Sequence, residues 1–238
     1  MCISRFCMKS LHIARLFVVA AAALSQMAHA AGPVKFNRTY ELNSSVKHKV
    51  DLQLNIGGLE GNIKFNVATK VTKVSPEKVE STAIIDEVTA EVGGSDPGIQ
   101  AGDLVREYND KRDIVNVTGG IQGSDPFRLA LTLEFFAPAE ALTEGKEITQ
   151  TLAENKTASI KALKIVTQLV GKEKVGETEG FKVVQKITEE GEGGLTTEST
   201  FIVLENGKIL SVDAKFTNMP IPAAGQSATG SIKAKIVE

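Results

Sequence analysis

Residues 196–217 read TTESTFIVLENGKILSVDAKFT and hold the clearest β-hairpin pattern in the chain. At the centre of this stretch lies Asn206-Gly207, a pair that favours a two-residue type I′ turn, because both central positions of that turn need a positive φ. A two-residue turn fixes the register, and one face of the hairpin then becomes almost entirely apolar while the other stays mostly polar. The cross-strand pairs expected from this turn include Val203 with Leu210 and Phe201 with Val212.

Alternation of apolar and polar residues recurs along most of the chain, which is typical of strands with one buried face. Between 34 and 56 it is nearly unbroken, and we expect two strands there with a turn at 43–45. Residues 137–145 could hold one helical turn. Further strands are predicted at 63–71, 79–92, 104–108, 114–117, 127–136, 148–152, 158–170, 181–187 and 232–237. The predicted fold is all-β, with about a dozen strands in a single antiparallel curved sheet, half-barrel or barrel; a two-sheet β-sandwich is the alternative.

The first thirty residues have the pattern of a secretory signal peptide. A positively charged segment is followed by a short apolar run at 16–24, and Ala28-His29-Ala30 fits a cleavage site. The apolar run is too short to span a membrane. We therefore expect an exported protein, periplasmic or extracellular, in which residues 31–238 form one all-β domain without a transmembrane segment.

Composition narrows the class of function. Cys2 and Cys7 both lie in the predicted signal peptide, so the remaining chain has no disulfide, no thiol nucleophile and no cysteine metal site. Since no cysteine follows the cleavage site, we expect no lipid anchor. Without the predicted signal peptide the chain has 24 basic and 29 acidic residues, a net charge of −5. This balance argues against nucleic acid as the main partner.

The sequence shows no catalytic pattern. His48 is the one histidine after residue 30, and it could be a general base, a metal ligand or a hydrogen-bonded residue at a rim. No Gly-x-Ser-x-Gly, P-loop, dinucleotide or zinc-protease motif accompanies it. The repeated Gly-Ser-Asp-Pro at 94–97 and 123–126 fits turns better than a calcium loop. We therefore predict a non-enzymatic protein without a cofactor or metal site; a hydrolase that uses His48 is the least favoured alternative.

Apolar residues at alternating strand positions are the candidate lining of a ligand cavity. With almost no helix to cover it, the apolar face of the sheet must close on another sheet, on itself or on a ligand. If it closes on itself, the same side chains form a packed core and the protein presents an edge strand or patch to a partner. The candidate lining residues are Phe65, Val67, Phe135, Phe181, Phe201, Val203, Val212 and Phe216.

The sequence combines a signal peptide with one long antiparallel meander that contains the late hairpin FIVLENGKIL at 201–210. This organisation resembles that of the periplasmic lipoprotein carriers and lipid-binding proteins of the LolA and LppX type. The resemblance is one of organisation over most of residues 31–238. It implies a half-barrel that carries an acyl chain on its apolar concave face. The chain departs from those proteins in having almost no predicted helix and no lipid-acceptor cysteine. We expect a protein that binds an apolar ligand or a lipidated envelope partner, or else an interaction module with a packed core.

Overall fold

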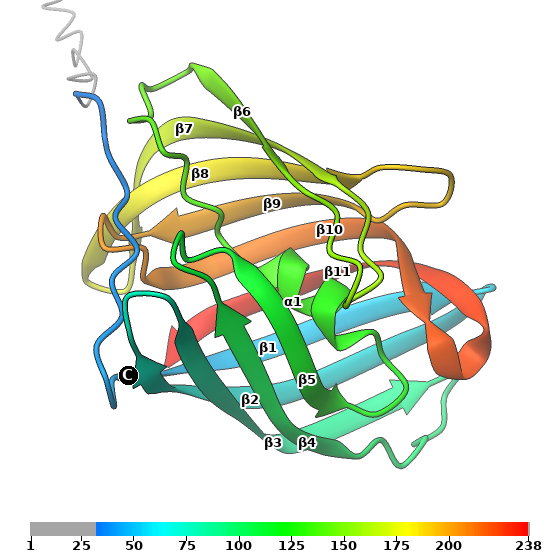
Figure 1. Ribbon diagram of the computed structural model, residues 1–238. Helices are drawn as coiled ribbons and strands as arrows, with labels where there is room; N and C mark the ends of the chain where they lie inside the picture. The colour runs from blue at the N-terminus through cyan, green and yellow to red at the C-terminus, as the bar shows by residue number, and fades with distance from the viewer. Residues whose placement is uncertain (1–31, 238) are drawn as a thin grey trace, which may run out of the picture.

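The computed structural model of the chain describes residues 32–237, and the predicted signal peptide lies outside them. The described residues form one curved antiparallel sheet and one short helix, α1 (Pro126–Leu133), with a 3-10 turn η1 (Pro222–Ala224) (Figure 1). The strands are β1 (Ser45–Ile56), β2 (Leu59–Val74), β3 (Val79–Val92), β4 (Ala101–Tyr108), β5 (Ile114–Ile121), β6 (Glu147–Leu152), β7 (Leu163–Val175), β8 (Thr178–Glu189), β9 (Thr196–Val203), β10 (Ile209–Ile221) and β11 (Gln226–Val237).

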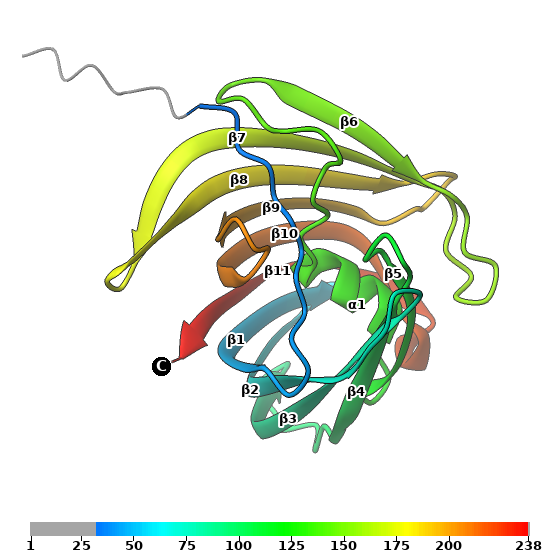
Figure 2. The same cartoon turned by 60° about the vertical axis from the view of Figure 1, so that its left-hand side comes forward.

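The strand order is β5-β4-β3-β2-β1-β11-β10-β9-β8-β7-β6. Strands that are consecutive in the sequence pair with each other, except β5 and β6, and the sheet is joined at its centre by the pairing of β1 with β11. The sheet does not close, so β5 and β6 are its edges, and it curves around α1 (Figure 2). The predicted fold class, a single curved antiparallel sheet, is confirmed.

The concave face of the sheet carries the hydrophobic core. On β1, for example, Val50 and Leu52 are buried, whereas Lys49 points to the outer face with the other odd-numbered residues. Helix α1 lies on the concave face against β5, β9 and β10. Phenylalanines pack against one another in this core, and Phe36 meets Phe135 edge-on at 5.1 Å between ring centroids.

The hairpin of β9 and β10 has the predicted register away from the turn but not beside it. Phe201 pairs with Val212 as expected. Val203, however, pairs with Ile209 instead of Leu210, because the register shifts after Ile209. The prediction of a regular hairpin was therefore right for most of the two strands and wrong for the ends next to the turn.

The turn between these strands is wider than two residues. Only Gly207 has a positive φ, 80°, whereas a type I′ turn would need one at Asn206 as well. The carbonyl groups of the turn are bound by a distant part of the chain. Glu205 accepts from the backbone N–H of Asn37 at 2.8 Å, and Asn206 accepts from that of Thr39 at 3.2 Å.

Residues 32–44 form the segment that makes these hydrogen bonds, here called the strap. A strand was predicted from residue 34 onward, but the strap has no strand and makes only an isolated bridge, Val34 with Leu142. It crosses the open side of the curved sheet, from the region of β7 to that of β2 (Figure 2). The alternation of its residues reflects one buried face, with Phe36 in the core. Its backbone hydrogen bonds go to loops and, at its end, to Val71 of β2, and they form no continuous ladder.

Helix α1 replaces most of the strand predicted at 127–136. Asp125 caps the helix by accepting a hydrogen bond from the N–H of Arg128 at 3.0 Å, and Pro126 occupies the first turn. The same four residues at 94–97 form a turn without a helix. The helical turn expected at 137–145 is also absent.

Candidate ligand-binding cavity beneath the strap

A cavity of about 380 Å³ lies between the strap and the concave face of the sheet. This volume falls in the range of roughly 300–1,000 Å³ that is common for small-molecule sites. The apolar part of the wall comes from β1, β2, β10 and β11 together with the end of α1, and most of the polar part comes from the strap, β3, β4 and the β9–β10 turn. Its apolar members are Val46, Val50, Val67, Val71, Leu133, Ile209, Val212 and Ala234.

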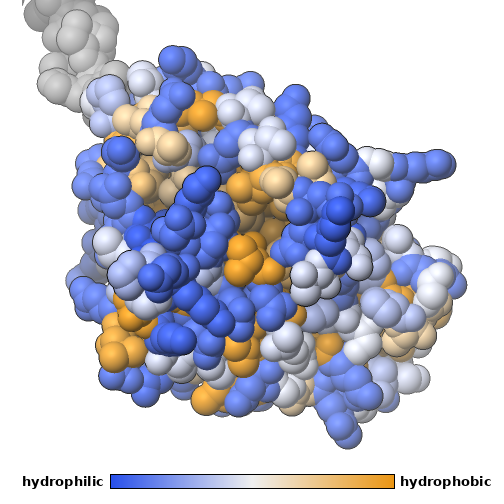
Figure 3. Space-filling model, viewed as in Figure 1, coloured by the Kyte–Doolittle hydropathy of each residue, from blue (hydrophilic) through white to orange (hydrophobic). Residues whose placement is uncertain are grey.

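The cavity is enclosed at one side and open at the other. Val50, Val67 and Val212 are buried and form the enclosed side, whereas Ser44 and Lys208 are exposed and mark the opening. On the face of the molecule shown in Figure 3, apolar atoms are visible in a hollow between hydrophilic side chains. The interior of the curved sheet is therefore not completely covered.

Arg38 fastens the strap over the cavity. Its guanidinium forms an ion pair with Glu134 and donates to the carbonyl of Arg112 at 3.2 Å. It also lies over the rings of Tyr40 and Tyr108, 5.4 and 5.3 Å from their centroids. Burial opposes the charge, but Glu134 and the two tyrosines together raise the pKa of Arg38, so the guanidinium stays protonated. The charge of Glu134 is thereby neutralised within the protein.

Three further titratable groups in the wall, Tyr40, His48 and Tyr108, are uncharged near neutral pH. Burial raises the pKa of both Tyr40 and Tyr108. For His48, burial lowers the pKa, and the charges of Arg106 and Lys208 lower it further. The His48 Nε2 donates to the carbonyl of Ile209 at 3.1 Å. Within residues 32–237 no carboxylate hydrogen-bonds to this ring, and no three His, Cys, Asp or Glu side chains gather as metal ligands.

Arg106 is the remaining charged residue of the inner wall. It lies on the inner face of β4 between Leu104 and Tyr108, opposite Ser81 of β3. Its Nε is buried and has no hydrogen-bond partner. Sequence reasoning did not select this residue, although an arginine between two inward-facing apolar positions was the available signal.

The structure places only some of the predicted lining residues at the cavity. Val67 and Val212 line the cavity. Phe65 lies against a smaller neighbouring cavity of about 30 Å³, which Val67 also lines. Phe181 is half-buried and packs edge-on against Phe36. The others are in the packed core, fully or almost fully buried: Phe135, Phe201, Val203 and Phe216.

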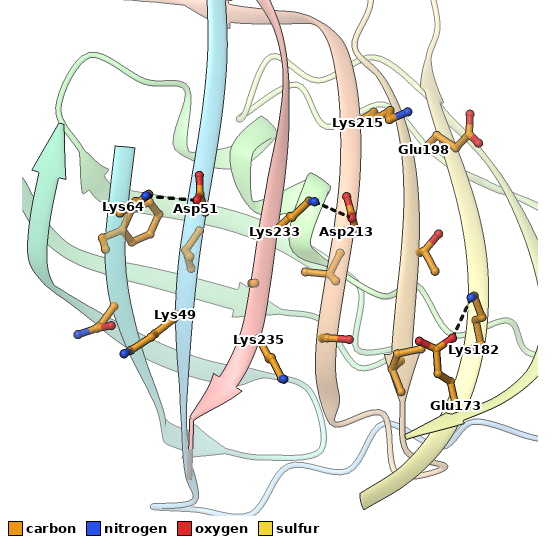
Figure 4. A pocket seen from close by; sticks show the side chains of 18 of the residues that line it. Lys49, Asp51, Lys64, Glu173, Lys182, Glu198, Asp213, Lys215, Lys233 and Lys235 are labelled. Carbon is orange, nitrogen blue, oxygen red and sulfur yellow. Dashed lines mark hydrogen bonds and ion pairs between the residues drawn. The ribbon is translucent and has the colours of Figure 1, made fainter. Parts of the chain in front are cut away.

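A second, wider groove of about 990 Å³ lies on the outer face of the sheet (Figure 4). Lysines and carboxylates alternate across it, and three pairs join them: Lys64–Asp51, Lys233–Asp213 and Lys182–Glu173. Exposed pairs of this kind each contribute about 0–1 kcal/mol. Because the two signs are interleaved, the groove has no strong field of one sign and has the character of a solvated sheet face.

One pair in the outer groove departs from this pattern. Lys49 of β1 lies directly opposite Lys235 of β11, and the two like charges face the same side of the sheet (Figure 4). Neither ammonium forms an ion pair within residues 32–237. Like charges at directly opposed positions destabilise a sheet.

Together these features define the class: an open, curved all-β sheet with one internal helix and a cavity beneath an N-terminal strap. No family model matches the chain, and no curated protein matches it. Among solved structures the chain is similar to the crystal structure of a DUF1329 family protein from Desulfovibrio piger, with 9% sequence identity and a TM-score of 0.23. That match covers 81% of this chain and 84% of the other.

None of the helices in residues 32–237 is long and apolar enough to cross a membrane.

Proposed function

We propose that this protein is an exported, non-enzymatic binding protein that holds the apolar chain of a ligand in the cavity beneath the strap. The observation that carries the proposal is the wall itself, in which valines of β1, β2 and β10 and Leu133 of α1 surround an open space of about 380 Å³. An apolar chain in contact with this wall leaves water, which contributes about 25 cal/mol for each Å² buried. The core around the cavity is packed, so the space is confined to one end of the curved sheet.

The size of the cavity limits the ligand. A water molecule occupies roughly 30 Å³ in the liquid, so 380 Å³ accommodates about a dozen groups of that size. This is enough for one chain of medium length and too little for two long chains. A free single-chain amphiphile therefore suits the cavity better than a diacyl lipid or a multiply acylated partner.

The test is a binding titration of residues 31–238 with a fluorescent single-chain alkyl probe, together with native mass spectrometry after solvent extraction. Val67→Trp fills the enclosed end of the cavity and is expected to weaken probe binding at least about tenfold, since the chain loses its space. Ile84→Trp, on the exposed outer face of β3, is the matched control and should bind as the wild type does.

A folded Val67→Trp protein with wild-type affinity would overturn the proposal, as would a wild-type protein that binds no alkyl probe. Where Val67→Trp does not fold, Val46→Trp at the half-exposed end of the cavity takes its place. Failure of binding would favour the alternative function, an interaction module that presents the unpaired edge of β5 or β6 to a partner.

A further inference from the structure

The Arg106 guanidinium is half-buried in the cavity wall without an acidic partner. Within residues 32–237 no carboxylate lies within ion-pair distance of it, and its buried Nε donates to nothing. Buried N–H groups are nearly always hydrogen-bonded, because losing water without gaining an acceptor costs free energy. The side chain lines the cavity, and within residues 32–237 none of its guanidinium nitrogens donates to a protein acceptor, so a ligand in the cavity is placed to supply one.

The charges of the cavity wall do not balance. Three cationic side chains line it, Arg38, Arg106 and Lys208, against two carboxylates, Glu41 and Glu134. Glu134 is already paired with Arg38. Glu41 is exposed at the opening. The interior therefore holds one cation more than its carboxylates neutralise.

The groups around Arg106 suit an anion. Ser81 pairs with Arg106 across β3 and β4, and Tyr108 is two residues along the same strand, so two hydroxyls lie on the same inner face. Burial keeps Tyr108 in the form that can donate a hydrogen bond. A guanidinium fork matches the oxygen atoms of a carboxylate or a phosphate.

The apolar wall begins beside these polar groups. Arg106 lines both the main cavity and the small neighbouring one, and so do Val67 and Leu133. A ligand that reaches Arg106 with its head can therefore place its chain against the valines of β1 and β2. Head and chain would occupy adjoining parts of one site.

We infer that the ligand is a single-chain amphiphile with an anionic headgroup, carboxylate or phosphate, and that Arg106 binds this headgroup. The inference rests on the proposed function, because it concerns the same cavity. Arg38 is not the headgroup residue, since Glu134 already occupies its guanidinium.

The experiment compares three probes that share one chain: dodecanoate, dodecyl phosphate and dodecanol, each displacing a fluorescent alkyl probe at pH 8. The wild type is expected to bind at least one anionic probe about tenfold more tightly than dodecanol, as charge-assisted bonds to a buried guanidinium would give. Whichever anion binds more tightly tells a fatty-acid type of ligand from a phosphate-bearing one.

Arg106→Gln keeps much of the side chain and removes the charge. It is expected to bind the anionic probes no better than dodecanol, with dodecanol itself unchanged. Lys186→Gln, on the exposed outer face of β8, removes one charge from the opposite face of the sheet and should leave all three affinities as they are.

The possible failures can be told apart. If none of the three probes binds, the proposed function fails and this inference fails with it. If dodecanol binds as tightly as both anions to the wild-type protein, only the headgroup inference is overturned, and this result does not depend on whether any variant folds. A folded Arg106→Gln protein that keeps the preference for anions would overturn it too.

Discussion

The ion pair between Arg38 and Glu134 makes the strongest prediction about the strap. The two side chains are 12% and 6% exposed, so each charge has lost nearly all of its water. Arg38→Met keeps an apolar stem of similar length but leaves the Glu134 carboxylate buried without its partner. Removing one member of a buried pair costs about 3–5 kcal/mol, because the remaining charge is uncompensated. We expect Arg38→Met to lower the free energy of unfolding by that amount.

The double variant Arg38→Met/Glu134→Gln separates this cause from a simple loss of packing. It leaves no buried charge, and replacing both members of such a pair by uncharged groups is often close to neutral. The second substitution should therefore restore at least about 1 kcal/mol of what the first removes, instead of adding a further loss. Glu134→Gln alone also removes a charge partner and should be destabilising.

Urea unfolding of residues 31–238, followed by far-UV circular dichroism because the chain has no tryptophan, gives the free energies from the midpoints and slopes. The reasoning is refuted if Arg38→Met costs less than about 1 kcal/mol, a value typical of exposed pairs. It is also refuted if the losses of the two single variants simply add in the double variant. Either result would mean that the strap is not held by this pair.

Three further predictions concern the sheet. Gln185 is fully buried and binds both the N–H and the carbonyl of Phe136, at 3.1 and 2.9 Å, so Gln185→Leu should lower the free energy of unfolding in urea by about 2–4 kcal/mol; a loss below 1 kcal/mol would contradict this. Burial would raise the pKa of Glu189, but hydrogen bonds from Arg128 and two backbone N–H groups hold it below 4.5. The ionised Glu189 therefore stabilises the folded protein above pH 4.5, and this contribution is lost as the pH falls through the lower folded-state pKa. The urea midpoint of Glu189→Gln should accordingly decline less steeply below pH 4.5 than that of the wild type. A decline parallel to that of the wild type would count against this prediction. Lys235→Glu turns the like-charge pair with Lys49 into an opposite-charge pair and should raise the free energy of unfolding by about 0.2–1 kcal/mol, seen as a higher Tm; a lower Tm would speak against the pairing.

Strand positions were predictable because one face of the sheet is buried throughout. The predicted strand at 79–92 coincides with β3 (Val79–Val92), and the hairpin of β4 and β5 was expected from the same alternation. Apolar burial on one side imposes a period of two on any strand, whichever neighbour it pairs with. This local rule was sufficient for eleven of the predicted strands to be placed on the sheet, while the strand expected from residue 34 and the one at 127–136 are not on it.

The same rule failed where a segment buries one face without joining the sheet. The strap alternates like a strand, but its backbone hydrogen bonds go to the β9–β10 turn, to Leu142 and, at its end, to Val71 of β2, and they form no continuous ladder. In α1 the spacing of the buried residues Phe127, Ala130 and Leu131 is that of a helix. A segment of eight residues is too short for the period of a helix to be distinguished from the alternation of a strand. Asp125 followed by Pro126 was the usable signal for the start of the helix.

Which side chains line the cavity depends on where the strap and α1 lie against the sheet, and the pattern of the sequence does not indicate this. Val67 and Phe201 have the same pattern, yet one borders open space and the other is in the packed core, because only the path of the strap and of α1 decides where space remains. Arg38 is in the strap and Arg106 is in β4. Nothing in their spacing along the sequence indicates that Arg38 forms an ion pair with Glu134 while Arg106 has no carboxylate partner within residues 32–237.

The β1–β11 pairing at the centre of the sheet has a consequence for how the chain reaches its fold. Every other strand pair in residues 32–237 joins neighbours in the sequence, so two local meanders can form early. The pairing of β1 with β11, with contacts such as Lys47 to Val237, forms later, because it brings together residues that are separated by both meanders. Removing β11 would therefore not trim an edge, as loss of a terminal strand usually does. It would cut the sheet in two and separate the halves that share the cavity.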